Sequence, residues 1–414
     1  MIRLLLALVL ALWTGAAGAH PFLTRNLRVL HLAEEGGRLV VYYRLTLPLV
    51  VGAGIVPPAP DAPVPAAPYT IPSRESGAAF WYADIARIVA DPAGLGARIL
   101  AGHVLRDPDG AQLTGRLLSV AVHPKGYVPP FDDVPQARAA TRPVPWPREV
   151  TRIDSGYVLV DAAIAYDLAP GVRRLSLAST LSPGALGEAG TVNLIVDHRA
   201  GGAVFYRIGG LLADPVVIAP SVWEGFASFV GGGIEHILEG ADHLAFLICL
   251  VLGAGGLGAL ASRITGFTVG HSVTLAAGFF GVVPAGAWFA PSVEAAIAFS
   301  ILLAALATLT GRGGPGLFLV TLSLGLVHGF GFSAALRDLL AADGPNVVPA
   351  LAGFNVGVEL GQLAVGLSVY AAFRFLRDGR ADRPARLVAV GACMAVAAFW
   401  LIERVPVVWA AAVG

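Results

Sequence analysis

The chain has 414 residues, of which 14% are charged, and its 28 basic and 28 acidic side chains cancel. Soluble domains carry roughly 25% charged residues, so this composition excludes a basic nucleic-acid-binding protein and disfavours a wholly soluble one. The mean hydropathy of +0.72 also disfavours a wholly soluble protein. Residues 20–220 hold 35 charged side chains, whereas residues 221–414 hold only 9 Arg, 11 acidic residues and no Lys. We therefore expect the second half of the chain to lie in a membrane.

The first 19 residues have the pattern of a secretory signal peptide. Arg3 supplies the positive start, the apolar stretch Leu4–Trp13 follows, and Ala17-Gly18-Ala19 forms a small-residue cleavage site. An uncleaved membrane helix is the alternative, but this stretch is short for a span of about 20 residues. Cleavage would make His20 the amino terminus, where its amine and ring nitrogen together could chelate a metal. His20 is therefore a secondary metal candidate.

Residues 20–220 are interpreted as a β-sandwich-like extracytoplasmic domain without cysteine. Alternating apolar positions predict a hairpin around Glu35-Gly36-Gly37 and further strands, at 27–48, 112–123, 157–167, 172–180, 191–198 and 203–208. The proline-rich residues 57–68 predict an extended loop, and residues 77–90 predict one helix. The histidines of this domain lack ligand spacing, so we interpret them as surface or turn residues; they are His31, His103, His123 and His198.

Six nearly uncharged stretches follow, and each has about the length that a membrane-spanning helix needs. They cover residues 236–257, 265–283, 292–310, 317–336, 348–373 and 387–402. Residues 223–230 predict an interfacial helix that ends at Gly231-Gly232-Gly233. The predicted fold is an α-helical membrane bundle of six transmembrane helices (234–414), which follows the β-sandwich-like domain and an interfacial linker (221–233).

The arginines of the membrane half predict its orientation. If residues 20–220 are exported, only Arg337 and Arg404 lie in exported loops or in the tail. Seven arginines then lie in cytoplasmic loops: Arg263, Arg312, Arg374, Arg377, Arg380, Arg383 and Arg386. This excess agrees with the positive-inside tendency. We expect a protein of the inner (plasma) membrane, with the amino-terminal domain and the carboxy terminus on the extracytoplasmic side.

Ionisable side chains inside apolar stretches cost at least a few kcal/mol, so they normally have a partner or a task. His236, Glu239 and His243 recur at i, i+3 and i+7. On a helix this spacing places two imidazoles and a carboxylate on one face, which suits a metal ion or a succession of weak sites. Asp242 could orient a ligand on a neighbouring helix. The alternative is a helix start at which these polar residues are simply hydrated.

The fifth stretch repeats this pattern with Asn355, Glu359 and Gln362, at i, i+4 and i+7. Asn355 and Gln362 are equally well explained as buried hydrogen-bonding residues between helices. Glu359 is a stronger candidate, because an unpaired carboxylate at mid-bilayer would be neutralised or would attract a cation. We treat Glu359 as a metal candidate and Asn355 and Gln362 as secondary ones.

Two further histidines, His271 and His328, lie deeper in the apolar stretches, and each could instead be only an interhelical hydrogen-bonding residue. Glycines at 325, 329 and 331 would let the helix of His328 pack closely against its neighbours. With the predicted topology the candidates follow an order of depth. From the exported side inward, they are His236, Glu239 and Glu294, then His243 and Asn355, then His271, His328 and Glu359. This order predicts a ladder of nitrogen and oxygen ligands.

The ligand types restrict the metal. The chain has only two Met and two Cys, and they do not cluster, which disfavours a copper(I) path built on sulfur. Imidazole with carboxylate suits a divalent transition metal ion, namely nickel, cobalt, zinc or iron.

Four ordered motifs in the membrane half resemble the HupE/UreJ family of hydrogenase and urease accessory membrane proteins, in a subgroup with a large amino-terminal domain. They are His236-x-x-x-Gly240-x-Asp242-His243, Phe267-Thr268-x-Gly270-His271-Ser272-x-Thr274, Gly325-Leu326-x-His328-Gly329-Phe330-Gly331-Phe332 and Phe354-Asn355-x-Gly357-x-Glu359-x-Gly361-Gln362-Leu363. The resemblance covers residues 230–405. It implies a nickel or cobalt permease in which the first-helix His and the Asp-His pair recognise the metal. Ile237 departs from the family, in which Pro often follows the first His.

Three classes of function remain open at this point. The first is a permease for a divalent transition metal, in which the ladder passes the ion inward. The second is a membrane-embedded metalloenzyme that holds the metal in a fixed site. The third is a membrane anchor whose exported domain binds a partner protein. The chain has no ATP-binding P-loop, so energised transport would need an ion gradient or another subunit.

Overall fold

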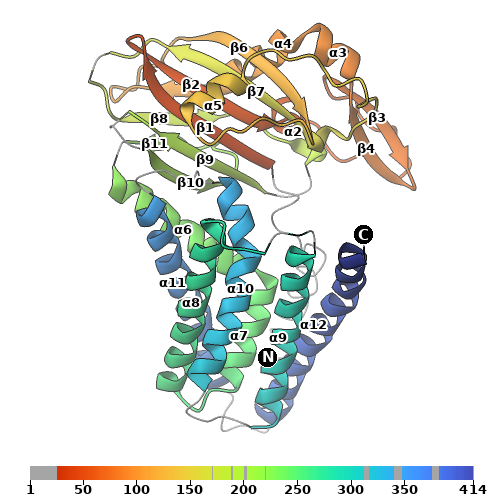
Figure 1. Ribbon diagram of the computed structural model, residues 1–414, viewed down its shortest axis with the longest axis vertical. Coiled ribbons are helices and arrows are strands. Elements are labelled where there is room, and N and C mark those ends of the chain that lie inside the picture. Colours follow the sequence, from red (N-terminus) through yellow and green to blue (C-terminus); the bar gives the residue numbers. More distant parts are fainter. Residues whose placement is uncertain are drawn as a thin grey trace. The chain divides into compact units, whose positions relative to one another are not determined.

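The structure, a computed structural model, describes residues 26–169, 171–187, 190–199, 203–219, 221–284, 286, 288–311, 317–339, 347–374 and 382–413. The chain divides into a β-rich unit and a helical unit (Figure 1), and the division falls within helix α6 (Val222–Glu239), between Ser228 and Phe229. The expected signal peptide and His20 lie outside the described residues.

The β-rich unit is built on a six-stranded sheet of order β10-β9-β1-β2-β7-β6. Its strands are β1 (Asn26–Glu35), β2 (Arg38–Thr46), β6 (Gly115–Pro124), β7 (Val158–Tyr166), β9 (Thr191–Asp197) and β10 (Val204–Gly209). Neighbours pair antiparallel except β1 with β9. Gly36 and Gly37 join β1 to β2 at φ of 57° and 76°, as a two-residue hairpin turn requires. The predicted hairpin is confirmed.

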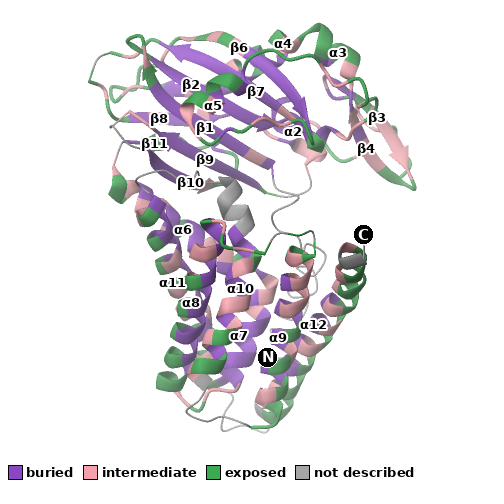
Figure 2. Cartoon of the chain, viewed as in Figure 1, coloured by how far each residue is buried: buried purple, intermediate pink, exposed green. Residues whose placement is uncertain are grey.

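A second sheet completes the core of this unit. It contains β5 (His103–Arg106), β8 (Leu175–Ser179) and β11 (Val216–Ile218). Leu32 and Tyr43 of the larger sheet and Leu177 of the smaller one belong to a single hydrophobic cluster, and Figure 2 shows the strands mostly buried. Short helices join the strands: α2 (Leu47–Val51), α4 (Pro92–Ala101) and α5 (Val134–Ala140). The residues at 57–68 form neither helix nor strand, as predicted.

The helix predicted at 77–90 is wrong over its first half. Residues Ala78–Ala83 form β4, which pairs with β3 (Thr70–Glu75), and only Ile85–Ala90 form a helix, α3. Ser76 and Gly77 lie between the strands at φ of 49° and 85°, so they form a tight turn. Asp84 then caps α3 by accepting a hydrogen bond from the Arg87 backbone N–H at 3.1 Å.

The interpretation of this unit's histidines as surface or turn residues is wrong for three of them. His31, His103 and His123 are only 1%, 3% and 3% exposed. His31 hydrogen-bonds through Nδ1 to His198 Nε2 at 2.9 Å. Burial lowers the pKa of His31 and of His103 to about 3, with the neighbouring His198 lowering the former and Arg28 the latter. The imidazoles of His31 and His103 are therefore neutral core side chains at physiological pH.

The helical unit contains the second half of α6 and six further described helices, except that Leu339 of α10 and residues 347–350 of α11 group with the β-rich unit. They are α7 (Ala241–Leu252), α8 (Leu257–Phe279), α9 (Phe289–Leu309), α10 (Leu317–Leu339), α11 (Val347–Arg374) and α12 (Asp382–Val413). Three described helices are long and apolar enough to cross a membrane: α9, α11 and Arg383–Ala411 of α12. Shorter apolar helices occur at Ala241–Leu252 and Phe318–Ser333. The number of six transmembrane helices stays a prediction.

Large apolar residues of these helices are exposed, and Figure 2 shows exposed and intermediate residues along α9, α11 and α12. Leu306 on α9 is 51% exposed, Leu360 on α11 is 47% exposed, and Ile402 on α12 is 72% exposed. Water would disfavour so many exposed apolar side chains on adjacent helices, whereas hydrocarbon accepts them. This outer surface fits a bilayer.

Helix α6 does not end at Gly231-Gly232-Gly233, so that prediction is wrong. It continues to Glu239, and the break falls at Gly240, whose ψ of 97° is not helical. A Cβ atom at Gly233 would lie 2.1 Å from Phe354 O, and one at Gly357 would lie 2.1 Å from Val230 O. The backbones of α6 and α11 therefore touch. This close packing outweighs the low helix propensity of glycine.

Glycine also brings α8 and α10 into backbone contact. A Cβ atom at Gly270 would lie 2.1 Å from Leu322 O, and one at Gly329 would lie 2.2 Å from His271 O. A Cβ atom at Gly331 would instead meet the side chain of Ile297 at 2.9 Å. The sequence-based expectation that this helix packs closely is confirmed at 329.

Gly325→Ala tests this helix contact, because the new Cβ would lie 2.1 Å from Phe267 O. We expect overpacking to lower the free energy of unfolding by about 1–3 kcal/mol, measured by thermal unfolding of the purified protein in detergent. Gly391→Ala on α12 is the control, because no atom lies within 4 Å of its Cβ position. Equal stability of the two variants would contradict the contact.

Candidate metal centre

Four histidines from four helices meet inside the helical unit: His236 on α6, His243 on α7, His271 on α8 and His328 on α10. The ring centroid of His243 lies 4.7 Å from that of His236, 6.1 Å from that of His271 and 5.5 Å from that of His328. We call these four residues the histidine cluster. Their rings gather around that of His243.

The cluster contains two overlapping groups of donor atoms. One atom each from His236, His243 and His271 lie within 4.8 Å of one another, and the same holds for Asp242, His243 and His328. His243 belongs to both groups. Nitrogen and carboxylate oxygen atoms at this separation can converge on a transition metal ion with modest movement.

The break at Gly240 decides which side chains reach the cluster. A Cβ atom at this position would lie 2.7 Å from His243 Nδ1 and 3.0 Å from His236 O, so the tight path excludes a larger residue. The continuous helix face that would join Glu239 to the two histidines does not form. Glu239 is exposed and belongs to neither donor group of the described residues.

A carboxylate orients His243. Asp242 Oδ1 accepts hydrogen bonds from His243 Nδ1 at 3.0 Å and from its backbone N–H at 2.8 Å. With the proton on Nδ1, the ring presents the lone pair of Nε2, which is buried and has no hydrogen-bond partner among the described residues. A carboxylate behind an imidazole is the usual way to orient a metal ligand. Asp242 therefore orients the ring of His243 on its own helix, and not a residue of a neighbouring helix as the sequence suggested.

A serine orients His328 in the same manner. The Ser300 hydroxyl on α9 donates to Ile297 O at 2.7 Å and lies 2.9 Å from His328 Nε2. Because its proton is used, the hydroxyl accepts from His328 Nε2–H. His328 Nδ1 then carries the lone pair, and within the described part of the chain it has no hydrogen-bond partner. Sequence reasoning missed Ser300.

Burial of the side chain is most costly for His271 among the members of the cluster. It is fully buried, and neither ring nitrogen has a hydrogen-bond partner among the residues that the structure describes. Burying such a polar group without a partner costs about 1–3 kcal/mol. A positively charged ligand would satisfy a lone pair of this ring. The donor set therefore fits a divalent transition metal.

Phenylalanine rings enclose the cluster. Phe332 lies 4.3 Å from the His236 ring and stacks on Phe354 at 4.8 Å, while Phe267 lies 4.9 Å from the His328 ring. Phe246 on α7 lies 5.3 Å from His328. These apolar walls limit water and lower the local dielectric constant, which strengthens the attraction between the donors and a cation. Three of these rings belong to the quoted motifs, but sequence reasoning gave them no role.

The other polar candidates pair with residues on neighbouring helices. Glu294 on α9 forms an ion pair with Arg404 on α12 at 3.2 Å. Along α11, three side chains bond to hydroxyls of α8: Asn355 to Ser272 at 2.7 Å, Glu359 to Thr265 at 2.9 Å and Gln362 to Thr268 at 3.0 Å. Within the described residues, neither Glu294 nor Glu359 belongs to a donor group. The three residues of α11 form a polar seam with α8, whereas Glu294 pairs separately with Arg404.

The exposed apolar helices and the buried donors define a membrane protein with a candidate metal centre. Residues 213–404 match the family model described as HupE / UreJ protein. This match agrees with the resemblance that the four motifs of the membrane half suggested. Comparison with curated proteins found no match, and comparison with solved structures found none either.

Asp242→Asn tests the orientation of His243. An amide can no longer hold the Nδ1 proton as a carboxylate does, so we expect nickel affinity to fall about 10–100-fold, measured by isothermal titration of the purified protein. Glu239→Gln removes a carboxylate three residues away and should change the affinity less than about twofold. A larger loss in Glu239→Gln than in Asp242→Asn would refute this assignment.

Proposed function

We propose that the protein is a membrane permease for a divalent transition metal, with nickel or cobalt as the cargo. The single observation that carries the proposal is the sharing of His243 between two donor groups. The HupE/UreJ family is associated with nickel or cobalt transport or with an accessory function, which supports the choice of metal. Imidazole and carboxylate donors suit both ions.

Shared ligation lets an ion move without complete release. An ion bound by His236, His243 and His271 keeps His243 while His328, and Asp242 once it gives up its hydrogen bond to His243 Nδ1, replace the other two ligands. Exchange of one ligand set for an overlapping one avoids bringing a bare divalent ion into a low-dielectric interior, where its desolvation would be costly. This handover replaces the ladder of sites suggested by the sequence.

We further propose a location and an orientation for the protein. The signal-peptide pattern and the excess of arginine in alternate loops support an inner-membrane protein with an extracytoplasmic amino-terminal domain. In this arrangement α9, α11 and α12 cross the bilayer as predicted. The ion would enter the cluster from the extracytoplasmic side.

Uptake into proteoliposomes tests the permease directly. Vesicles that contain the protein and a trapped metal-sensitive dye should accumulate nickel, and His243→Ala should reduce the initial rate at least about tenfold, since both ligand sets lose a donor. Glu239→Gln should keep the wild-type rate. An unchanged oligomer profile and helix content confirm that His243→Ala is folded.

Two results would contradict transport. One is uptake that His243→Ala leaves unchanged. The other is a purified protein that retains one nickel ion per chain against a strong chelator while vesicles accumulate none. The latter result describes a fixed metal centre and would favour the membrane-embedded metalloenzyme.

A further inference from the structure

The polar seam between α8 and α11 has no role in the proposed handover of the metal. It contains three residues of each helix: Thr265, Thr268 and Ser272 on α8, and Asn355, Glu359 and Gln362 on α11. The former recur at i, i+3 and i+7 and the latter at i, i+4 and i+7, so each set lies along one face of its helix. These side chains offer carboxylate, hydroxyl and amide oxygens but no imidazole or thiol.

Glu359 carries the charge of the seam, and one of its oxygens lacks a partner. The Thr265 hydroxyl donates to Glu359 Oε1 at 2.9 Å. Glu359 Oε2 is buried and has no hydrogen-bond partner among the described residues, although Thr265 itself lies on the exposed side of α8. A carboxylate oxygen enclosed between apolar helices is costly without a counter-charge.

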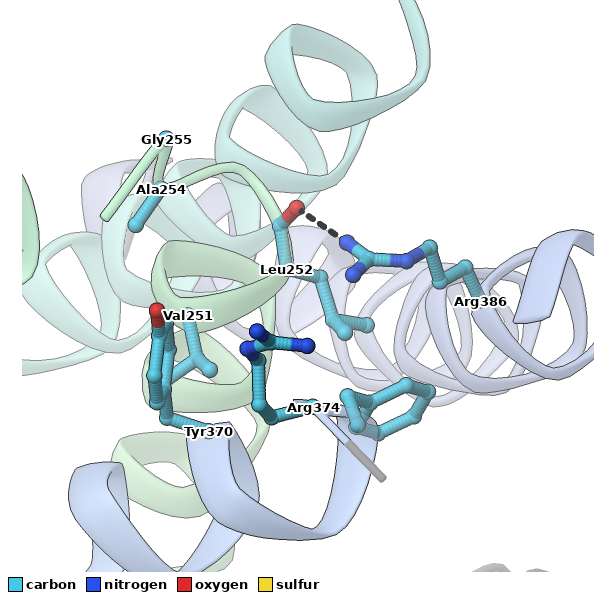
Figure 3. A pocket seen from close by; sticks show the side chains of 8 residues that line it. Val251, Leu252, Ala254, Gly255, Tyr370, Arg374 and Arg386 are labelled. Carbon is cyan, nitrogen blue, oxygen red and sulfur yellow. Dashed lines mark hydrogen bonds between the residues drawn. The ribbon is translucent and has the colours of Figure 1, made fainter. Parts of the chain in front are cut away.

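The two arginines of α8 and α11 do not supply this counter-charge. Arg263 of α8 donates from Nη1 to Leu250 O at 3.1 Å, so it caps the end of α7. Arg374 of α11 lies about 22 Å further along the helix axis, where it lines a pocket with Arg386 (Figure 3). Within the part of the chain that the structure describes, Glu359 has no ion pair. Its charge is left for an ion from solution.

The hydroxyl of Ser272 faces more acceptor oxygens than it has protons. Ser272 Oγ lies 2.7 Å from Thr268 O and 2.7 Å from Asn355 Oδ1. Its single proton can serve only one of these oxygens. Reversal of the Asn355 amide does not supply another donor, because Asn355 Nδ2 already donates to Leu351 O at 2.9 Å. The seam thus has a surplus of oxygen acceptors one helical turn from Glu359.

The types of donor in the seam identify the kind of cation. Oxygen ligands without imidazole or thiol suit hard cations rather than nickel or cobalt. A single carboxylate balances one positive charge, so a divalent ion would leave an excess charge in a low-dielectric interior. A proton on Glu359 Oε2 would itself lack an acceptor within the described residues. A larger monovalent ion such as sodium can reach oxygens that lie beyond hydrogen-bond distance.

We propose that the polar seam is a binding site for a sodium ion, with Glu359 Oε2 as its charged ligand and hydroxyl and amide oxygens of the seam as neutral ones. Ser272 of the seam directly follows His271 of the histidine cluster, so α8 connects the sodium site to the metal cargo. On the basis of the proposed function, a sodium gradient supplies the energy that a chain without a P-loop cannot take from ATP.

Sodium binding by the full chain tests the site without nickel transport. In detergent at constant ionic strength, with choline chloride as the replacement salt, sodium chloride should raise the melting temperature of the wild type. Glu359→Gln keeps an oxygen for the Thr265 hydroxyl but removes the charge, and should raise the apparent Kd for sodium at least about tenfold. Glu239→Gln, which removes an exposed carboxylate of α6, is the matched control and should bind sodium like the wild type. An unchanged nickel affinity shows that Glu359→Gln is folded.

Nickel uptake separates the sodium site from the proposed transport. An inward sodium gradient should accelerate uptake into proteoliposomes at least about fivefold over choline for the wild type, but not for Glu359→Gln. The sodium site is overturned if sodium stabilises Glu359→Gln as much as the wild type, or if the melting temperature follows pH and not sodium. Nickel uptake that ignores the gradient keeps the permease and overturns the sodium coupling. Sodium binding that depends on Glu359, in a protein without nickel uptake, supports the seam site and refutes the permease.

Discussion

Backbone contact between α8 and α10 is the constraint on which the candidate metal centre depends. Gly270 precedes His271 and Gly329 follows His328, and a Cβ atom at either glycine would lie within 2.2 Å of a backbone oxygen of the other helix. Lipid offers no hydrophobic force to hold helices together, so such close packing must supply much of their association. The contact fixes the two imidazoles, and α6 and α7 bring His236 and His243 to them. The binding of a divalent ion would in turn stabilise helices that otherwise bury unsatisfied nitrogens.

The sequence predicted the presence of helices and strands better than the residues at which they begin and end. Strong periodicity and two consecutive glycines identified the β1–β2 hairpin, and apolar length identified most helices of the membrane half. The stretch predicted as one helix at 236–257 is instead divided at Gly240 between α6 and α7. The glycines at 231–233 suggested a helix end, but tertiary contact with α11 keeps α6 helical through them. The break instead uses Gly240, where a side chain would collide with His243. Local propensity does not contain that information, because the contacting atoms come from distant parts of the chain.

The candidate metal site, too, could be predicted from the sequence only in part. All four membrane histidines were recognisable from their cost in lipid, and the structure brings them together. Glu239, Glu294 and Glu359 met the same criterion, but the structure does not group them with the histidines. Their partners, such as Arg404 for Glu294 and Thr265 for Glu359, lie on other helices and have no motif. An ionisable residue in an apolar stretch therefore predicts a partner, but only the packing shows whether that partner is a side chain or a ligand.

The central claim is that the histidine cluster binds one metal ion. X-ray absorption spectroscopy at the nickel edge of the loaded protein tests it most directly, because multiple scattering counts imidazole ligands. We expect a shell with three imidazole nitrogens, corresponding to His236, His243 and His271, and no sulfur. A His243→Ala/His271→Ala double variant should show at least two fewer imidazoles. A shell of water and carboxylate oxygen, unchanged in that variant, would contradict it.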